Sequence, residues 1–168
     1  MNDKRLRFEA LAMPHLDAAY NLARWLTRNP AEADDIVQDA MLRAFRAFDG
    51  FRGDGAKPWL LAIVRNCHLN ALGQKKRQAA VPLPENDSLA DCDPTPEGRA
   101  MAADDGRRLN AALAKLPEEF REVVVLRELE EMSYREIADV TGAPIGTVMS
   151  RLARGRALLR VQLAGDNT

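Results

Sequence analysis

The residues whose types and spacing point most directly to a chemistry are the arginines that follow position 150. Arg151 and Arg154 lie three residues apart, and Ser150 and Arg154 lie four apart, so they can share one face of a helix. An arginine on such a face can donate two hydrogen bonds to guanine, which discriminates between bases by about 1–3 kcal/mol. The segment therefore predicts a helix that contacts DNA, and the alternative is a helix whose arginines are only solvated.

Nucleophilic or metal-dependent catalysis is the other chemistry to consider, and His15, Cys67 and His68 have suitable side chains. Because Cys67 and His68 are adjacent, they are poorly spaced for binding one metal ion. Cys67 also falls on the apolar face of a predicted helix, with Ile63 and Val64. We therefore expect no catalytic residue, no metal site and no cofactor.

The elements that must position the arginines form a helix-turn-helix. Ser133 and Glu136 fit a capping box at the start of its first helix. Gly142 and Pro144 then interrupt that helix, because glycine tolerates left-handed dihedral angles and proline cannot continue a helix interior. A second helix is expected from about Ile145, and the side chains predicted to pack inward are Val148, Leu152, Leu158 and Leu159. Two short helices across a tight turn, the second one basic, are typical of proteins that place a helix in the DNA major groove.

A further amphipathic helix is predicted nearer the N-terminus. Asn29, Pro30 and Glu32 supply an N-cap, a first-turn proline and an acid at its start. Its apolar stripe consists of Ala33, Ile36, Val37, Ala40, Met41, Ala44, Phe45 and Phe48. Its polar face consists of Asp34, Asp35, Gln38, Asp39, Arg43 and Arg46. This acidic face suits a basic helical partner, and the alternative is a solvated face with an Asp39–Arg43 ion pair.

Aromatic residues surround the loop of glycine and charged residues from 49 to 57, and they are Phe45, Phe48, Phe51 and Trp59. A helix is predicted from Pro58 to about Arg77, and Trp59 is expected to face the core because it lies among apolar residues. Three cations end this helix: Lys75, Lys76 and Arg77. Aromatic rings can stack on an unpaired base, and cations can hold a separated strand.

Charge is distributed unevenly along the 168 residues, whose net charge is −1. Residues 1–77 contain 13 Lys/Arg and 9 Asp/Glu, residues 78–105 contain 1 and 7, and residues 106–168 contain 10 and 9. Residues 79–99 also contain four prolines and no helical periodicity, which is typical of an extended, flexible linker. The sequence therefore predicts an all-α protein of two small helical domains, residues 5–77 and 106–163, joined by a linker at 78–105.

The chain is expected to be soluble and cytoplasmic. No stretch approaches the roughly 18 uninterrupted apolar residues of a membrane span, and the N-terminal residues do not make a persuasive signal peptide. Cys67 and Cys92 lack the spacing of a metal site and favour a reducing compartment. The small net charge also argues against strong DNA binding by the chain alone, because phosphate neutralisation supplies most non-specific affinity.

Two sets of motifs resemble the extracytoplasmic-function (ECF) group of sigma-70-type RNA polymerase sigma factors. The motifs similar to region 2 of that family are Ala33–Asp39, Pro58–Leu60 and Ile63–Asn66. The motifs similar to region 4 are Leu116–Pro117, Arg121, Leu126–Arg127, Met132–Tyr134, Glu136–Ala138, Gly146–Val148 and Ser150–Leu152. They occur in the family's order and span about residues 8–163, which makes the pair more specific than either set alone.

The resemblance implies a role for each surface. Core RNA polymerase is expected to bind Asp34, Asp35, Gln38, Asp39 and Arg43. The melted strand of the −10 element is expected to contact Arg65, Asn66, Lys75, Lys76 and Arg77. The double-stranded −35 element is expected to contact Thr147, Met149, Ser150, Arg151, Ala153, Arg154 and Arg156, with Thr147 and Arg156 nearer the phosphates. Met149 and Asn70 depart from the residues usual in the family, so one cationic contact is expected to be missing and Asn70 receives no role.

The partners implied by the resemblance are core RNA polymerase, promoter DNA and an anti-sigma factor. Two other functions stay open at this point besides catalysis. An autonomous helix-turn-helix regulator would need a dimerisation surface or a ligand pocket, for which the sequence has no convincing signal. An anti-sigma or adaptor protein would not need the basic helix after position 145.

Overall fold

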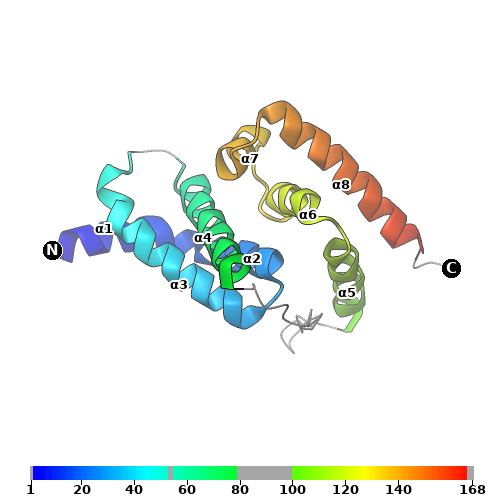
Figure 1. Cartoon of the computed structure of the whole chain (residues 1–168), viewed down its shortest axis with the longest axis horizontal. Coiled ribbons are helices and arrows are strands. Elements are labelled where there is room, and N and C mark those ends of the chain that lie inside the picture. The colour runs from blue at the N-terminus through cyan, green and yellow to red at the C-terminus, as the bar shows by residue number, and fades with distance from the viewer. Residues whose placement is uncertain (1, 53–54, 79–99, 166–168) are drawn as a thin grey trace. The chain divides into compact units, whose positions relative to one another are not determined.

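The computed structural model describes residues 2–52, 55–78 and 100–165, and every regular element within these ranges is helical (Figure 1). The helices divide into two compact units, and the division falls between α4 and α5. The predicted all-α class is therefore confirmed. Most of the predicted linker, including Cys92, lies outside the described residues.

The first unit is built on three mutually packed helices, α2, α3 and α4. Its elements are α1 (Asn2–Ala12), η1 (Met13–His15), α2 (Leu16–Thr27), α3 (Pro30–Ala47), η2 (Phe48–Gly50) and α4 (Ala56–Gln78). Small buried residues such as Ala19, Ala33 and Ala40 let the helices approach closely, and Leu22 and Leu61 fill the space between them. Burial of this apolar surface drives the three helices together.

The start of α3 follows the local signals in the sequence. The Asn29 side-chain oxygen accepts hydrogen bonds from the backbone N–H of Ala31 at 2.9 Å and of Glu32 at 3.3 Å. Pro30 occupies the first helical position, where its missing N–H costs nothing. The predicted N-cap is confirmed.

The start of α4 differs from the prediction, because the helix begins at Ala56, two residues before Pro58. Proline is tolerated in the first turn of a helix, so Pro58 does not mark the boundary. Trp59 is only partly buried and lies at the edge of the core rather than inside it. Its ring packs against Phe51, with centroids 4.6 Å apart, and this contact replaces the expected burial among α4 residues.

The second unit contains the helix-turn-helix. Its elements are α5 (Ala100–Ala114), α6 (Glu118–Val124), the π-helical turn η3 (Val125–Leu129), α7 (Tyr134–Thr141) and α8 (Ile145–Gly165). Helix α8 packs against α6 and α5. Helix α5 begins inside the predicted linker and continues across the predicted boundary at residue 106.

The caps of α7 hold the helix-turn-helix as the sequence predicts. The Glu136 backbone N–H donates to Ser133 Oγ at 3.1 Å, and the Ser133 backbone N–H donates to Glu136 Oε1 at 3.0 Å. Gly142 ends the helix with φ of 72°, and its N–H donates to the Ala138 carbonyl at 2.8 Å. Both the capping box and the glycine C-cap are confirmed.

One predicted core position of α8 is wrong. Leu158 is 39% exposed, whereas Gly155 is buried. The buried face runs through Val148, Leu152 and Gly155, spaced four and three residues apart. Gly155 lies where α6 approaches so closely that an added Cβ would be 2.7 Å from Val124 Cγ2.

Candidate functional site

The outward face of α3 carries the acidic residues predicted to bind a partner. Asp34, Asp35 and Gln38 are exposed, and Asp39 is partly buried. Both carboxylate oxygens of Asp39 accept from Arg43 Nε, at 3.1 and 3.2 Å, so the expected ion pair is present. This hydrogen bond raises the pKa of Arg43 above its ordinary value. The face therefore presents two unshielded carboxylates beside one neutralised pair.

Cys67 of α4 lies beneath this face in the core. Burial raises the pKa of its thiol to about 11, and the charge of Asp39 acts in the same direction. The thiol is therefore protonated near neutral pH, and a protonated thiol is a poor nucleophile. This placement agrees with the predicted apolar face and leaves Cys67 unsuited to catalysis.

Leu42 is a residue on this face that the sequence reasoning missed. Its side chain is 59% exposed although it is large and apolar. It follows Asp35 by seven residues, Gln38 by four and Asp39 by three, so it lies in the middle of the polar stripe. An apolar centre with a polar rim is the usual anatomy of a protein-binding surface. The signal that could have revealed Leu42 is its position, because it is a large apolar residue that lies off the apolar stripe of α3.

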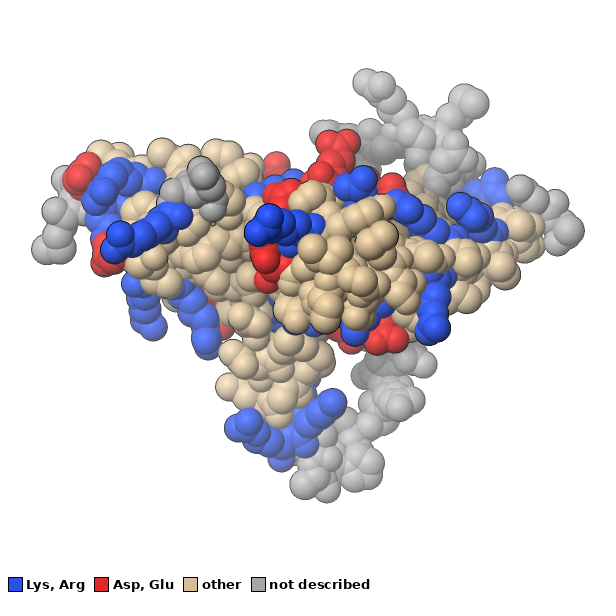
Figure 2. Space-filling model, turned by 90° about the horizontal axis from the view of Figure 1, so that it is seen from above, with Lys and Arg blue, Asp and Glu red and all other residues tan. Residues whose placement is uncertain are grey.

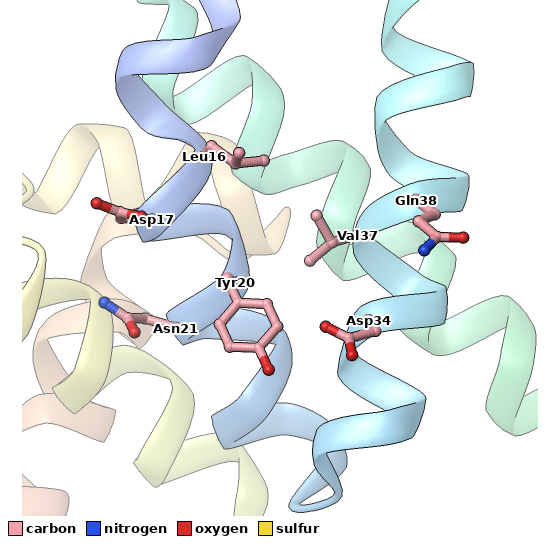
Figure 3. A pocket seen from close by; sticks show the side chains of 7 residues that line it. All are labelled: Leu16, Asp17, Tyr20, Asn21, Asp34, Val37 and Gln38. Atoms are coloured by element: carbon pink, nitrogen blue, oxygen red, sulfur yellow. The ribbon is translucent and has the colours of Figure 1, made fainter. Parts of the chain in front are cut away.

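Helix α2 also contributes to this surface, which the sequence reasoning did not predict. A hollow between α2 and α3 is lined by Leu16, Asp17, Tyr20, Asn21, Asp34, Val37 and Gln38. Within it the Tyr20 ring and the Asp34 carboxylate point toward one another across the space between the helices (Figure 3). The polar residues of α2 gave no motif, so only the packing of the two helices reveals them.

The predicted contacts on α4 divide between two faces of the helix. Asn66, Lys76 and Arg77 are exposed and Arg65 is partly buried. Lys75 points elsewhere and forms an ion pair with Glu32 at the start of α3. Residues of a helix are rotated by about 100° each, so Lys75, nine residues after Asn66, lies on the opposite side of α4, whereas Arg77, eleven residues after Asn66, lies close to its side.

The predicted contacts on α8 also divide. Met149, Ser150, Ala153 and Arg154 are exposed, and Thr147 and Arg151 are partly buried. Arg156 donates from Nε to Glu128 Oε1 at 2.8 Å, and this hydrogen bond raises the pKa of Arg156 above its ordinary value. Arg156 therefore links α8 to η3 and is not an unpaired cation on the recognition face.

Two further arginines have structural roles that the motif match alone did not reveal. Arg121 is buried and donates to the carbonyl of Leu113 at the end of α5, at 3.1 Å, and to that of Leu116 in the turn before α6, at 2.8 Å. Arg127 donates to the Met132 carbonyl at 2.8 Å, and its guanidinium lies 4.8 Å from the Tyr134 ring centroid. Arg121 therefore fixes the turn between α5 and α6, and Arg127 fixes the turn that leads into α7.

The surface charge of the described residues is mixed. Lysine and arginine side chains are scattered among neutral and acidic residues on the face shown in Figure 2, and they do not form one continuous basic patch there. Within the described residues, no group of three His, Cys, Asp or Glu side chains could hold a metal ion. No helix in the same ranges is long and apolar enough to cross a membrane.

Family models match both units of the chain. The model for sigma-70 region 2 matches residues 11–78, and the model for sigma-70 region 4 matches residues 106–159. Both matches agree with the motifs quoted above from the sequence.

Curated relatives extend this likeness over nearly the whole chain. The ECF RNA polymerase sigma factor SigE of Mycolicibacterium smegmatis is 37% identical over 158 residues, which cover 94% of this chain and 62% of SigE. The ECF RNA polymerase sigma factor SigM of Mycobacterium tuberculosis is 36% identical over 165 residues, which cover 98% of this chain and 81% of SigM. The chain thus spans less than two thirds of SigE and about four fifths of SigM.

Solved structures share the fold. The sigma factor RpoE from Bartonella quintana, in complex with the anti-sigma factor NepR, has a TM-score of 0.78 and 27% identity, and the match covers 96% of this chain and 99% of RpoE. CnrH, in complex with the cytosolic domain of CnrY, has a TM-score of 0.68 and 27% identity, and the match covers 97% of this chain and 91% of CnrH.

Proposed function

Because this chain belongs to the ECF group of RNA polymerase sigma factors, which function in transcription initiation, we propose a division of that work between its two units. In the cytoplasm the chain binds core RNA polymerase and carries it to promoters with matching −35 and −10 elements. The first unit docks on the polymerase and melts the −10 duplex, and the second unit reads the −35 element. The chain supplies no catalytic group, because the polymerase carries out RNA synthesis.

The docking surface consists of the outward face of α3 and the hollow that it shares with α2. Asp34 and Asp35 supply negative charge, and Leu42 supplies an apolar centre. This combination fits a helical partner with basic side chains around an apolar strip. An i,i+4 ion pair between exposed side chains contributes little, so Asp39 and Arg43 can exchange their mutual contact for contacts with the partner.

The outer face of α4 is the proposed site for −10 DNA. Asn66 is exposed and has both a donor and an acceptor for a base edge, and Lys76 and Arg77 can neutralise phosphates of the separated strand. Arg65 lies beside Asn66 and supports the same strand. Lys75 joins them only after leaving Glu32, which is a small cost because exposed ion pairs are worth about 0–1 kcal/mol.

The exposed side of α8 is the proposed reader of −35 DNA. Arg154 and Ser150 are four residues apart and both exposed, so they can approach base edges together, with Met149 and Ala153 making apolar contacts. Thr147 and Arg151 lie at the margin of this side and suit the phosphates. Arg156 reaches the DNA backbone only if it leaves Glu128, so we give it the weakest part in binding.

An anti-sigma factor is the proposed regulator. RpoE, which shares the fold over nearly its whole length, was crystallised with the anti-sigma factor NepR. A comparable inhibitor of this chain would cover the acidic α3 face or the exposed side of α8. Either contact would prevent promoter recognition without any change in the chain's own fold.

The observation that carries the proposal is the presence of both family regions, in order, each with its predicted binding face exposed. Run-off transcription with purified core polymerase tests it directly. The complex should initiate RNA at a defined position on a promoter selected from a randomised library, whereas core polymerase alone should not. Failure to alter the start site would refute the proposal.

A further inference from the structure

Helix α1 is anchored to the end of α3 through an aromatic cluster. Phe8 is 6% exposed and packs edge-on against two rings, with its centroid 5.3 Å from Phe45 and 5.6 Å from Phe48. Phe45 belongs to the last turns of α3, and Phe48 opens the short helical turn η2. The N-terminal helix therefore contacts the point where the chain leaves α3.

Lys4, one helical turn before Phe8, adds a polar link to the same place. Its ammonium lies 3.0 Å from Asp49 Oδ2 and 4.6 Å from the centroid of the Phe45 ring. The Lys4 side chain is 29% exposed, whereas Asp49 is 73% exposed. An ion pair between flexible exposed side chains contributes little, but an ammonium held against an aromatic face is restricted to one position. Lys4 therefore links Asp49 of η2 to Phe45 at the end of α3, while Phe8 contacts Phe48 at the start of η2.

The residues that follow η2 lead directly to the proposed −10 site. Phe51 packs on Trp59 in the first turns of α4, with ring centroids 4.6 Å apart and ring planes 36° from each other. Asn66 follows Trp59 by seven residues, which places both on one face of α4. The segment from Phe48 to Phe51 is thus held by α1 at one end and by Trp59 at the other.

We propose that Lys4 and Phe8 are positioning residues for −10 recognition. They hold η2, and thereby keep the Phe51 ring against Trp59, on the face of α4 that carries Asn66. This inference rests on the proposed role of the α4 face in binding −10 DNA. It assigns to α1 a part in promoter specificity, although no side chain of α1 needs to contact the DNA.

A charge exchange tests the proposal. In the reconstituted holoenzyme, Lys4→Glu and Asp49→Lys should each reduce permanganate reactivity of the melted −10 thymines and relax the base preference there. The reduction should be about fivefold, within the range measured for coupled neighbouring residues, and the double variant should recover to about half of the original signal or more. Recovery is expected because the exchanged ion pair joins the same two backbone positions, and it should be incomplete because the ammonium contact with the Phe45 ring is not restored.

Arg5→Glu is the matched control. Arg5 carries the same charge on the same helix, but its ion pair, 2.9 Å long, is made within α1 to Glu9. With Arg5→Glu, the permanganate reactivity of the −10 thymines should equal that measured with the original protein. Phe8→Leu, which keeps an apolar side chain but removes the ring contacts, should reduce the footprint without reducing binding to core polymerase.

The outcomes separate the two proposals. If Asn66→Ala weakens the footprint and Lys4→Glu does not, the positioning role is wrong while the −10 site stands. If neither variant has an effect, the −10 site itself is wrong. If Lys4→Glu weakens the footprint, Asp49→Lys does not, and the double variant fails to recover, Lys4 acts on DNA directly and the positioning role is again wrong.

Discussion

At the level of single residues, the surroundings of a side chain decide what it can do. Asp35 and Asp39 are both acids on α3, but Asp39 is bound by Arg43 whereas Asp35 lies exposed on the docking surface. Arg154 and Arg156 differ in the same way, because only Arg156 is bound to Glu128. Residue type and spacing assign the same role to both members of each of these pairs, and only their contacts in the structure distinguish them.

Leu42 is the residue whose change should affect polymerase binding most cleanly. Leu42→Ser should weaken binding to core polymerase about tenfold, which corresponds to 1.4 kcal/mol, because it removes an apolar anchor from the centre of the surface. The urea unfolding curve should not change, since Leu42 is exposed. Leu6→Ser is a matched control, because Leu6 is also exposed but lies on α1. Equal binding of both variants would contradict the role of Leu42.

Arg154 should determine the preference at one base pair. Arg154→Ala should lose about 1–3 kcal/mol of discrimination at a single −35 position, because a guanidinium reads guanine through two hydrogen bonds. Transcription from a library of −35 sequences measures this preference. Arg160→Ala removes an exposed cation from the same helix and should leave the preference unchanged. A uniform loss over all sequences would make Arg154 a phosphate contact.

Cys67 gives a prediction about pH. Because the folded state raises the pKa of the thiol from 9.0 to about 11, the folded state favours the protonated thiol. The resulting stabilisation is complete below pH 9 and is lost as the pH rises toward the folded-state pKa. The free energy of unfolding, measured in urea with a reductant, should therefore fall more steeply over this interval than in Cys67→Ala. Parallel curves for the two proteins would contradict the burial of the thiol.

At the level of elements, the sequence predicted what depends on neighbouring residues. The capping box of Ser133 and Glu136, the Asn29 cap and the Gly142 turn each involve residues three or four positions apart. Their geometry is set within one helical turn, so the residue types alone are sufficient. The same holds for the acidic face of α3, which follows from helical periodicity.

The sequence could not predict contacts between distant elements. Lys75 pairs with Glu32 across 43 residues, and Lys4 pairs with Asp49 across 45 residues. These pairs depend on which faces of the helices meet, and many charged residues compete for each partner. For the same reason the sequence did not reveal that Lys75 pairs with Glu32 or that Leu158 is exposed.

Gly155 tests the packing of α6 against α8. Gly155→Ala should lower the free energy of unfolding by about 1–3 kcal/mol, because the new methyl group would overlap Val124 and approach the Phe120 carbonyl at 3.4 Å. Gly146→Ala in the same helix meets no atom within 4 Å and should not destabilise the protein. Thermal unfolding of both variants measures the difference. Equal melting temperatures would contradict the close helix contact.

At the level of the whole molecule, the net charge supports the proposal that the two units act through a larger partner. The acidic segment 78–105 offsets the basic residues elsewhere and leaves a net charge of −1. A protein with so small a net charge gains little affinity from the release of counterions. Under the proposed function, core polymerase would therefore supply most of the attraction to DNA, while α4 and α8 would supply the choice of sequence.

Fluorescence anisotropy of a labelled promoter, at about 150 mM salt as inside cells, tests this dependence most directly. The chain alone should not distinguish its promoter from a scrambled duplex. Addition of core polymerase should give tight binding to the promoter only, and Asp35→Lys should abolish that gain because it reverses a charge on the docking surface. Equally tight and selective binding by the chain without polymerase would contradict the account.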